Sequence, residues 1–341
     1  MSVSQSTRRL NSAENQHGES EEHVIKSVDE LQNLGMNMSD ITKLHAANIG
    51  TVGMVLSTPA KHLENIKGFS EAKVQKLIDC CKKLQPSGFM SATEALDSRK
   101  CILKINSGAT ALNELLGGGF QSKSITEIHG EFRTGKSQLC HTLCVTTQMP
   151  RSEGGAEGKV VFIDTEGTFR PERLIEIATA YGFEPDQIVE NVLFKRVMTH
   201  DEQMLAPQQI AALLTQQPPE PIKLVIIDSL MSLFRVEFSG RGELSIRQQL
   251  LGRHLHDLQR IADEFNIAVV VTNQMTADPG AMIAACSQKP VGGNIVAHAC
   301  QTRILMKKGR ENSRIVKLID SPEMPEGDAQ IQLSAKGVED N

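Results

Sequence analysis

The chain has 341 residues, of which 40% are apolar and 23% charged, as in a globular protein with one large and one small domain. Its formal net charge of −5 excludes a bulk argument for nucleic-acid binding, so any such site must come from a local basic cluster. The sequence predicts no membrane span and no secretory signal. The seven cysteines are odd in number and lack C-x-x-C spacing, which argues against disulfides or a zinc site and for a reducing compartment.

The N-terminal part of the chain divides into a polar segment and a helical one. Residues 1–22 are rich in Ser, Asn, Gln and Glu, and we expect a disordered tail because they cannot bury enough apolar surface to offset the entropy of ordering. Residues 23–84 are predicted to form a compact helical unit, with Val28, Leu31 and Leu34 at helical spacing.

A hairpin between two helices is predicted within this unit. Residues 66–70 separate two helical runs, Gly68 suits a turn with positive φ, and Ser70 is the expected N-cap of the second run. In a helix-hairpin-helix, backbone N–H groups and nearby lysines, here Lys67 and Lys73, contact DNA phosphates without reading sequence. The alternative is that Gly68 only ends a helix.

A linker and a larger domain follow. Pro86 and Gly88 predict a linker over residues 85–100, and residues 101–341 alternate between predicted strands and helices. Continuous β-branched runs are typical of strands buried on both faces of a mostly parallel sheet, so the predicted class is α/β. A helix is predicted over residues 243–265 from its apolar stripe. The clearest predicted strands are residues 125–129, 160–163, 224–227, 268–272, 303–306 and 315–319.

A phosphate-binding loop is the most specific motif of the chain. Residues 130–137 match G-x-x-x-x-G-K-[ST], preceded by a predicted strand and followed by a helix, which makes a chance match improbable. Backbone N–H groups of such a loop bind phosphate oxygens; Lys136 is expected to reach the β- and γ-phosphates of ATP, and Ser137 to ligate Mg²⁺. The residues expected to contact the nucleotide here are Gly130, Glu131, Phe132, Arg133, Thr134, Gly135, Lys136, Ser137 and Gln138.

Three later predicted strands end in polar residues. Because ligands of parallel sheets bind at the carboxyl ends of strands, these residues are expected to face the phosphate-binding loop. Asp228 fits a Walker B aspartate that holds Mg²⁺, and Glu166 is the candidate general base for the attacking water. Gln274 is the candidate sensor of the γ-phosphate. For either carboxylate alone, the alternative is a polar end to a strand.

The motifs together resemble those of the eukaryotic and archaeal RecA-like strand-exchange recombinases, from about residue 24 to the C-terminus. The matching stretches are residues 131–137, 164–173, 239–244 and 272–274. Residues 275–280 and 321–326 are most similar to the meiosis-specific branch, whereas Gly167 is closer to the general one.

The resemblance implies a RecA-like P-loop ATPase core behind a small all-α helix-hairpin-helix domain. It implies a filament of protomers on single-stranded DNA, with ATP and Mg²⁺ at each subunit interface, which pairs that strand with a homologous duplex and exchanges strands. Base pairing then tests homology, so the protein is expected to bind the DNA backbone. A nuclear location and recombination mediators as partners are also implied.

Two loops are expected to face the DNA. The first spans residues 235–247, for which the alternative is a solvated charged turn. The second spans residues 275–294, without obvious secondary structure and directly after Gln274, which offers a route from the ATP state to DNA affinity. The expected DNA-binding residues of the two loops are Arg235, Arg241, Arg247, Lys289, Gly292 and Gly293.

Further residues are assigned by the resemblance. Phe89 and Ala92 match the Phe-x-x-Ala polymerisation motif, which adds a strand to a neighbour's sheet; alternatively Phe89 packs on its own domain. Arg170 is assigned to the adenine side of ATP, and His298 to the neighbour's ATP, although a lone His is more often structural.

Two departures from the family pattern are visible. Residues 286–290 read Cys-Ser-Gln-Lys-Pro where the family commonly has Asp-Pro-Lys-Lys-Pro, which puts an acidic cap over the neighbour's ATP in doubt. Lys195 stands where the docking pocket usually has alanine, and its long side chain is expected to narrow that pocket.

Three functions remain in competition: an active recombinase, an accessory protein of the same fold that binds ATP and a recombinase without exchanging strands, and a structural DNA-binding module with ATP as a switch. The joint presence of both DNA loops, the docking motif and the helical domain favours the recombinase. A motor helicase would not be expected to carry Phe89 and Ala92 before its core.

Overall fold

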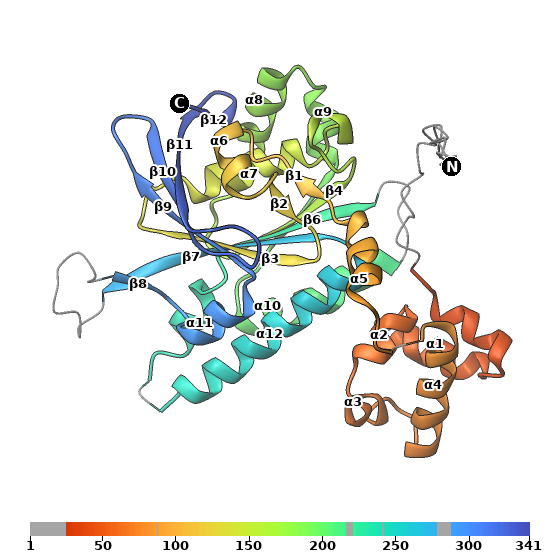
Figure 1. Ribbon diagram of the computed structural model, residues 1–341. Helices are drawn as coiled ribbons and strands as arrows, with labels where there is room; N and C mark the ends of the chain where they lie inside the picture. Colours follow the sequence, from red (N-terminus) through yellow and green to blue (C-terminus); the bar gives the residue numbers. More distant parts are fainter. Residues whose placement is uncertain (1–24, 87, 216–220, 241, 278–287) are drawn as a thin grey trace, which may run out of the picture.

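The computed structural model describes residues 25–86, 88–215, 221–240, 242–277 and 288–341. The predicted tail, residues 1–22, lies outside them. Figure 1 shows a small helical unit beside a larger unit built on a central sheet. No helix in these ranges is long and apolar enough to cross a membrane.

The small unit has a hydrophobic core of its own, to which Val28, Ile41 and Leu77 contribute fully buried side chains. Gly68 has a φ of 90°, so the turn before its last helix needs the conformation that glycine adopts without strain. Ser70 occupies the N-cap position of that helix, but its side chain makes no capping hydrogen bond. The helices are η1 (Val28–Leu34), α1 (Met38–Ala46), α2 (Val52–Ser57), α3 (Ala60–Glu64) and α4 (Glu71–Leu84).

Lys73 forms an ion pair within this unit. Lys73 was expected to contact phosphates, but its Nζ lies 3.0 Å from a carboxylate oxygen of Asp40. Lys43 lies 2.8 Å from the other carboxylate oxygen. The Asp40 side chain is only 6% exposed, and a buried carboxylate is costly without cationic partners, so the two lysines compensate its charge. Lys67 is exposed.

The described strands of the large unit form one sheet of ten, with the order β12-β11-β10-β9-β3-β7-β6-β4-β5 and with β8 paired to β7. Strands β9, β3, β7, β6, β4 and β5 are parallel, whereas β9 to β12 form antiparallel pairs. Strands β1 (Lys104–Ile105) and β2 (Phe120–Gln121) form a separate pair. The sheet strands are β3 (Ser124–Gly130), β4 (Lys159–Asp164), β5 (Val192–Arg196), β6 (Ile222–Asp228), β7 (Ala268–Ala277), β8 (Gln288–Pro290), β9 (Thr302–Lys308), β10 (Ser313–Asp320), β11 (Gly327–Ser334) and β12 (Gly337–Asp340).

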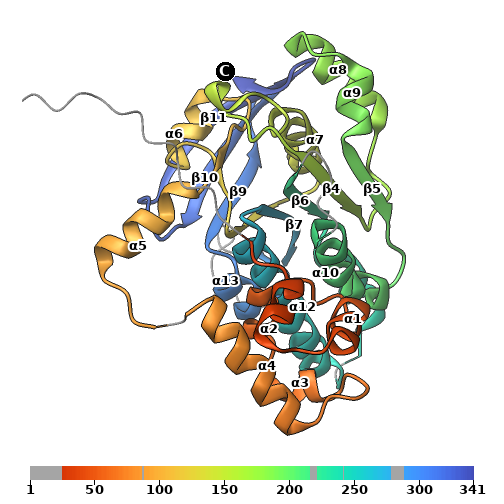
Figure 2. The same cartoon turned by 90° about the vertical axis from the view of Figure 1, so that its right-hand side faces the viewer.

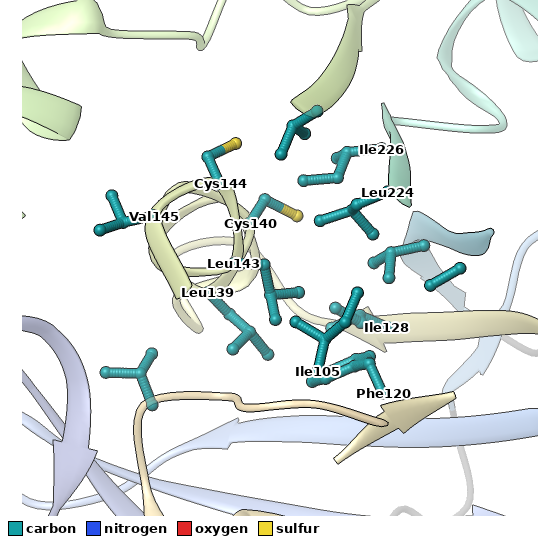
Figure 3. Close-up of a cluster of buried hydrophobic side chains, with 14 of the residues drawn as sticks. Ile105, Phe120, Ile128, Leu139, Cys140, Leu143, Cys144, Val145, Leu224 and Ile226 are labelled. Carbon is teal, nitrogen blue, oxygen red and sulfur yellow. The ribbon is translucent and has the colours of Figure 1, made fainter. Parts of the chain in front are cut away.

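Helices cover both faces of the sheet, and Figure 2 shows these layers edge-on. Successive residues of β6 point to opposite faces: Leu224 and Ile226 pack with α7 and α8, whereas Val225 and Ile227 pack with α10 and α12. Figure 3 shows the first of these clusters around α7. The helices of this part are α5 (Ala92–Ser98), η2 (Arg99–Cys101), α6 (Thr110–Leu115), α7 (Lys136–Thr146), η3 (Arg151–Glu153), α8 (Pro171–Tyr181), α9 (Pro185–Glu190), α10 (His200–Thr215), α11 (Ser232–Glu237), α12 (Leu244–Phe265) and α13 (Asn294–Ala299).

Arg260 of α12 joins the two units. Its guanidinium donates to the Met54 carbonyl at 3.2 Å and to the Thr58 hydroxyl at 2.6 Å, and its Nε donates to the Ser57 hydroxyl at 3.1 Å. Three of its donors therefore hold the end of α2 against the large unit.

The segment between the units is more regular than the predicted linker. Helix α5 occupies half of it and begins at Ala92, where Ser91 and Glu94 form a capping box. The helix buries no residue, so the capping box and not packing determines where it begins.

A buried histidine makes the stability of the fold depend on pH. The His254 side chain on α12 is fully buried, neither ring nitrogen has a hydrogen-bond partner among the described residues, and burial lowers its pKa to about 4. The unfolded chain, with a pKa near 6.5, binds a proton between these values that the folded chain does not bind. The free energy of unfolding therefore falls as pH decreases from 6.5 towards 4.

We expect His254→Leu to reduce this acid destabilisation by about 2 kcal/mol between pH 7 and pH 5, as measured by urea unfolding at both pH values. His256→Leu, at an exposed position of the same helix, is the matched control and should keep the full loss. An unchanged pH dependence in His254→Leu would show that the acid sensitivity has another source.

Candidate functional site

The loop between β3 and α7 has the geometry of an anion-binding turn. Gly135 has a φ of 100° and precedes the first residue of α7. A Cβ at Gly130 would lie 2.4 Å from the carbonyl oxygen of Met306, so only glycine fits there. The Lys136 Nζ donates to the carbonyl oxygens of Gly130 at 3.0 Å and of Glu131 at 2.9 Å. Burial lowers the pKa of Lys136, and attraction to Asp228 and Glu166 opposes this shift.

Asp228 is the centre of a set of oxygen ligands. Its side chain is buried at the end of β6 and accepts hydrogen bonds from the hydroxyls of Ser137 at 2.6 Å, of Thr168 at 3.3 Å and of Thr272. Hydroxyl and carboxylate oxygens are the ligands that Mg²⁺ prefers, and this ion is usually held by one or two such groups together with phosphates and water. Thr168 and Thr272 had no predicted role, although both lie within stretches of the motif resemblance.

Glu166 lies at the same edge of the sheet, after β4. Its Oε1 accepts hydrogen bonds from the Ser229 hydroxyl at 2.5 Å and from the Gln274 amide at 2.7 Å. The parallel pairing of β4 with β6 sets Asp164 opposite Asp228, and that of β3 with β7 sets Gly130 opposite Gln274. The register therefore brings the predicted catalytic residues Lys136, Glu166 and Gln274 around one cavity.

This cavity has a volume of about 460 Å³, within the range of small-molecule sites. Loop N–H groups and Lys136 suit a polyphosphate, and the oxygens around Asp228 suit a hard divalent ion, so the residues fit ATP with Mg²⁺. Its lining residues are Phe132, Arg133, Thr134, Gly135, Lys136, Ser137, Gln138, Glu166, Thr168, Asp228, Ser229, Thr272, Gln274, Met275, Arg314 and Leu333.

Some predicted residues lie away from the cavity lining, and one unpredicted residue lies in it. Arg170 is exposed and donates to the carbonyls of Gly167 and Phe169, and His298 is exposed on α13. The missed residue is Arg314 of β10, which is buried and donates from Nε to the Thr134 carbonyl at 3.1 Å. No local motif marks Arg314, because the β9–β10 hairpin brings it back to the loop from a distant part of the sequence.

Helices occupy both ends of the first predicted DNA loop, so the segment between them is shorter than the expected span. Arg235 lies in α11, and Arg247 lies in the first turn of α12. Arg241 lies outside the described residues. Helix α12 begins at Leu244, as expected from the helix predicted over residues 243–265; Leu244 and Ile246 in its first turn are exposed, and Leu250 in the next turn packs on the core.

The second predicted loop has regular structure at both ends. Strand β7 continues to Ala277 and pairs antiparallel with β8, which carries the exposed Lys289 opposite Thr276. Gly292 and Gly293 follow with φ values of 100° and 63°, and Gly293 precedes α13. The expectation of an unstructured segment was wrong at these ends because cross-strand hydrogen bonds satisfy their backbone groups.

Hydrogen bonds connect the second predicted DNA-facing segment to α12 and the first segment to the cavity. The Gln248 amide of α12 donates to the Gly292 carbonyl at 3.2 Å. The Arg235 guanidinium donates to Gln274 Oε1 at 3.0 Å, and the amide of Gln274 reaches Glu166. One continuous chain of contacts therefore links a predicted DNA cation to the candidate general base.

The docking motif and its expected receptor are both on the surface. Phe89 is fully exposed, so it does not pack on its own domain. Strand β5 is an edge of the sheet and carries Leu193 and Phe194, both partly exposed. The Lys195 Nζ donates to Gln209 Oε1 of α10 at 2.6 Å, which holds its side chain along the surface of this edge.

A family model described as Rad51 matches residues 98–341. The chain belongs to the Rad51 family. It is 48% identical over 320 residues to the meiotic recombination protein DMC1 of Saccharomyces cerevisiae, covering 93% of this chain and 95% of that protein. It is 48% identical over 322 residues to the human meiotic recombination protein DMC1/LIM15 homolog, covering 94% of each chain.

A DNA repair protein is also among the relatives of this Rad51-family chain. The DNA repair protein RAD51 homolog 1 of Arabidopsis thaliana is 45% identical over 342 residues, covering 100% of this chain and 99% of that protein. The predicted family and the mostly parallel α/β core are thereby confirmed.

The position of Glu166 generates a direct test of its role. We expect Glu166→Gln to bind ATP like the parent protein, since the substituted side chain keeps an oxygen to accept from Ser229 and Gln274. Loss of a general base should lower the ATP turnover number by roughly 10²- to 10⁴-fold. Equilibrium binding of a fluorescent ATP analogue and steady-state phosphate release measure the two quantities. Lost binding with little change in turnover of the bound fraction would make Glu166 structural.

Proposed function

We propose that the protein is an ATP-dependent homologous recombinase. It forms filaments on single-stranded DNA, pairs that strand with a homologous duplex and exchanges strands, in meiotic recombination and double-strand break repair in the nucleus. The observation that carries the proposal is the contact of Gln274 with both Glu166, at the nucleotide cavity, and Arg235, on the surface assigned to DNA. The names of the most similar proteins support the same activity.

In this proposal, ATP binds in the cavity, where it supplies the bond to be hydrolysed. Lys136 exchanges its two carbonyl partners for phosphate oxygens, and residues 130–138 provide backbone donors. Ser137 and Asp228 hold Mg²⁺, and Glu166 takes a proton from the attacking water. Arg170 contacts the adenine, and His298 contacts the nucleotide of the next protomer.

Hydrolysis depends on DNA through Gln274. Without DNA, the Arg235 guanidinium donates a hydrogen bond to Gln274 Oε1, and the Gln274 amide donates one to Glu166. When Arg235 binds a DNA phosphate it releases Gln274, which can then respond to the γ-phosphate. Arg241, Arg247 and Lys289 supply further backbone contacts, and Gly292 and Gly293 allow the second segment to adjust.

Assembly joins the exposed Phe89 segment of one protomer to the β5 edge of the next, by addition of a strand. Ala92 is the small second residue of the motif. Lys195 must be accommodated at this edge, so the docking pocket is narrower than in the family pattern. Recombination mediators are the expected further partners.

Formation of joint molecules between a single strand and a homologous duplex, with ATP and Mg²⁺, tests the function. We expect product from the parent protein only with a homologous duplex, and none from Lys136→Ala, because that variant lacks the cation that reaches the phosphates. If the parent binds DNA and forms filaments without producing joint molecules, the accessory function replaces the recombinase.

The docking mode is tested by assembly. Phe89→Glu places a charge in an apolar pocket, so we expect protomer association to weaken at least about thirtyfold, the effect of losing an anchor of about 2 kcal/mol. Light scattering across a concentration series measures the association. Lys195→Ala, which shortens the side chain at the receiving edge, should associate at least as tightly as the parent. Assembly of Phe89→Glu at parental concentrations would place the docking contact elsewhere.

A further inference from the structure

A buried polar cluster lies beneath Gln274, outside the cavity lining. It is formed by Glu127 of β3 and Asn273 of β7, whose residues are both 0% exposed. The parallel register of β3 with β7 sets His129 opposite Asn273, and Glu127 lies two residues earlier on the same face. The mechanism proposed above gives these groups no part.

The Asn273 side chain makes three hydrogen bonds that point in different directions. Its Nδ2 donates to Glu127 Oε1 at 2.7 Å and to the Val291 carbonyl at 2.6 Å. Its Oδ1 accepts from the backbone N–H of Gln274 at 2.8 Å. The backbone N–H of Val291 also donates to the Gln274 carbonyl at 3.0 Å. One amide group therefore connects the nucleotide-facing Gln274 with the returning arm of the second DNA-facing segment.

Glu127 keeps the orientation of this amide. Its other oxygen accepts from the Nε of Arg303 at 2.7 Å, so the carboxylate is fixed between β9 and β7. The ring of His129 lies 3.6 Å from the same oxygen, and burial lowers the pKa of that histidine to about 4, so it adds no positive charge at neutral pH. An ionised carboxylate can only accept hydrogen bonds. Glu127 therefore holds the Nδ2 of Asn273, and not its Oδ1, towards β3.

We infer that Asn273 is a positioning residue, held by Glu127, that transmits movement of the second DNA-facing segment to Gln274. This inference rests on the proposed DNA-dependent hydrolysis of ATP.

The path of the chain beyond Asn273 gives the coupling its direction. Gly292, with its φ of 100°, directly follows Val291, and its carbonyl accepts from Gln248 of α12. Movement of the returning arm of the second DNA-facing segment therefore acts on Val291 through the chain, and movement of α12 acts on it through Gln248. Val291 is hydrogen-bonded to the Gln274 carbonyl directly and to the Gln274 N–H through the Asn273 side chain. Movement of Val291 therefore shifts Gln274 and changes its hydrogen bond to Glu166.

The experiment compares Asn273→Ala with Val271→Ala, a buried apolar position two residues earlier on β7 that pairs with Glu127 in the sheet, so its truncation makes a cavity beside the cluster without removing any side-chain hydrogen bond. The ratio of ATP turnover with and without single-stranded DNA is measured at saturating ATP. We expect this ratio to fall by roughly tenfold in Asn273→Ala, the effect of losing a hydrogen bond to a charged group, with the KM for ATP within about twofold of the parent. Val271→Ala should keep the parental ratio.

Hydrogen exchange of the Val291 amide, in protein without DNA, reports the anchor independently of turnover. We expect its exchange to accelerate by about tenfold in Asn273→Ala and to remain parental in Val271→Ala. Asn273→Ser keeps a polar side chain that is too short to join Glu127 to Val291. It should therefore behave as Asn273→Ala does.

Variants of Glu127 test the second half of the inference. Glu127→Gln keeps an oxygen for Asn273 and should retain most of the DNA stimulation, whereas Glu127→Ala should lose it. The double variant with Asn273→Ala should be no worse than either single change, because both remove one shared contact.

The outcomes separate the two proposals. Parental stimulation and parental Val291 exchange in both Asn273 variants would overturn the inference, as would an equal loss of stimulation in Val271→Ala. If the parent protein itself shows no stimulation by DNA, the proposed function fails, whereas the exchange measurement still decides whether Asn273 anchors Val291.

Discussion

The parallel pairing of β3, β7, β6 and β4 is the constraint on which the site depends. In-register hydrogen bonds place Gly130 opposite Gln274 and Asp164 opposite Asp228, so the strands end at a common edge. The side chains at these strand ends therefore lie close together, although they are far apart in the sequence. A shift of one residue would turn every side chain of a strand to the opposite face and would remove the polar residues at its end from the site.

Much of this arrangement was predictable from the sequence because the central strands are continuous β-branched runs. All six predicted strands lie within observed ones, and the phosphate-binding loop lies between β3 and α7 as expected. Strands β1 and β2 were missed because two residues carry no pattern. Strand β5 was missed because Lys195 and Arg196 interrupt its apolar run.

The errors around the DNA-facing segments have a different cause. Glycine and charge suggested loops at residues 235–247 and 275–294, but α11 and α12 occupy the ends of the first stretch, and cross-strand pairing extends β7 into the second. The contacts of Arg314 with Thr134, and of Asn273 with Glu127 and Val291, join residues far apart in sequence. Such contacts carry no local signal, because only the sheet topology brings their partners together.

The two edges of the sheet bear on how the protein avoids uncontrolled aggregation. An exposed edge strand presents unpaired backbone groups to any other strand, and native proteins often protect such edges with charge. Strand β5 carries Lys195 in its middle, held by Gln209. At the opposite edge, β12 is short, and its Asp340 carboxylate accepts from the backbone N–H groups of Thr110 and Ala111 at the start of α6. Both ends of the sheet thus discourage indiscriminate strand addition, and in the proposed docking mode the β5 edge selects for a segment able to accommodate a lysine.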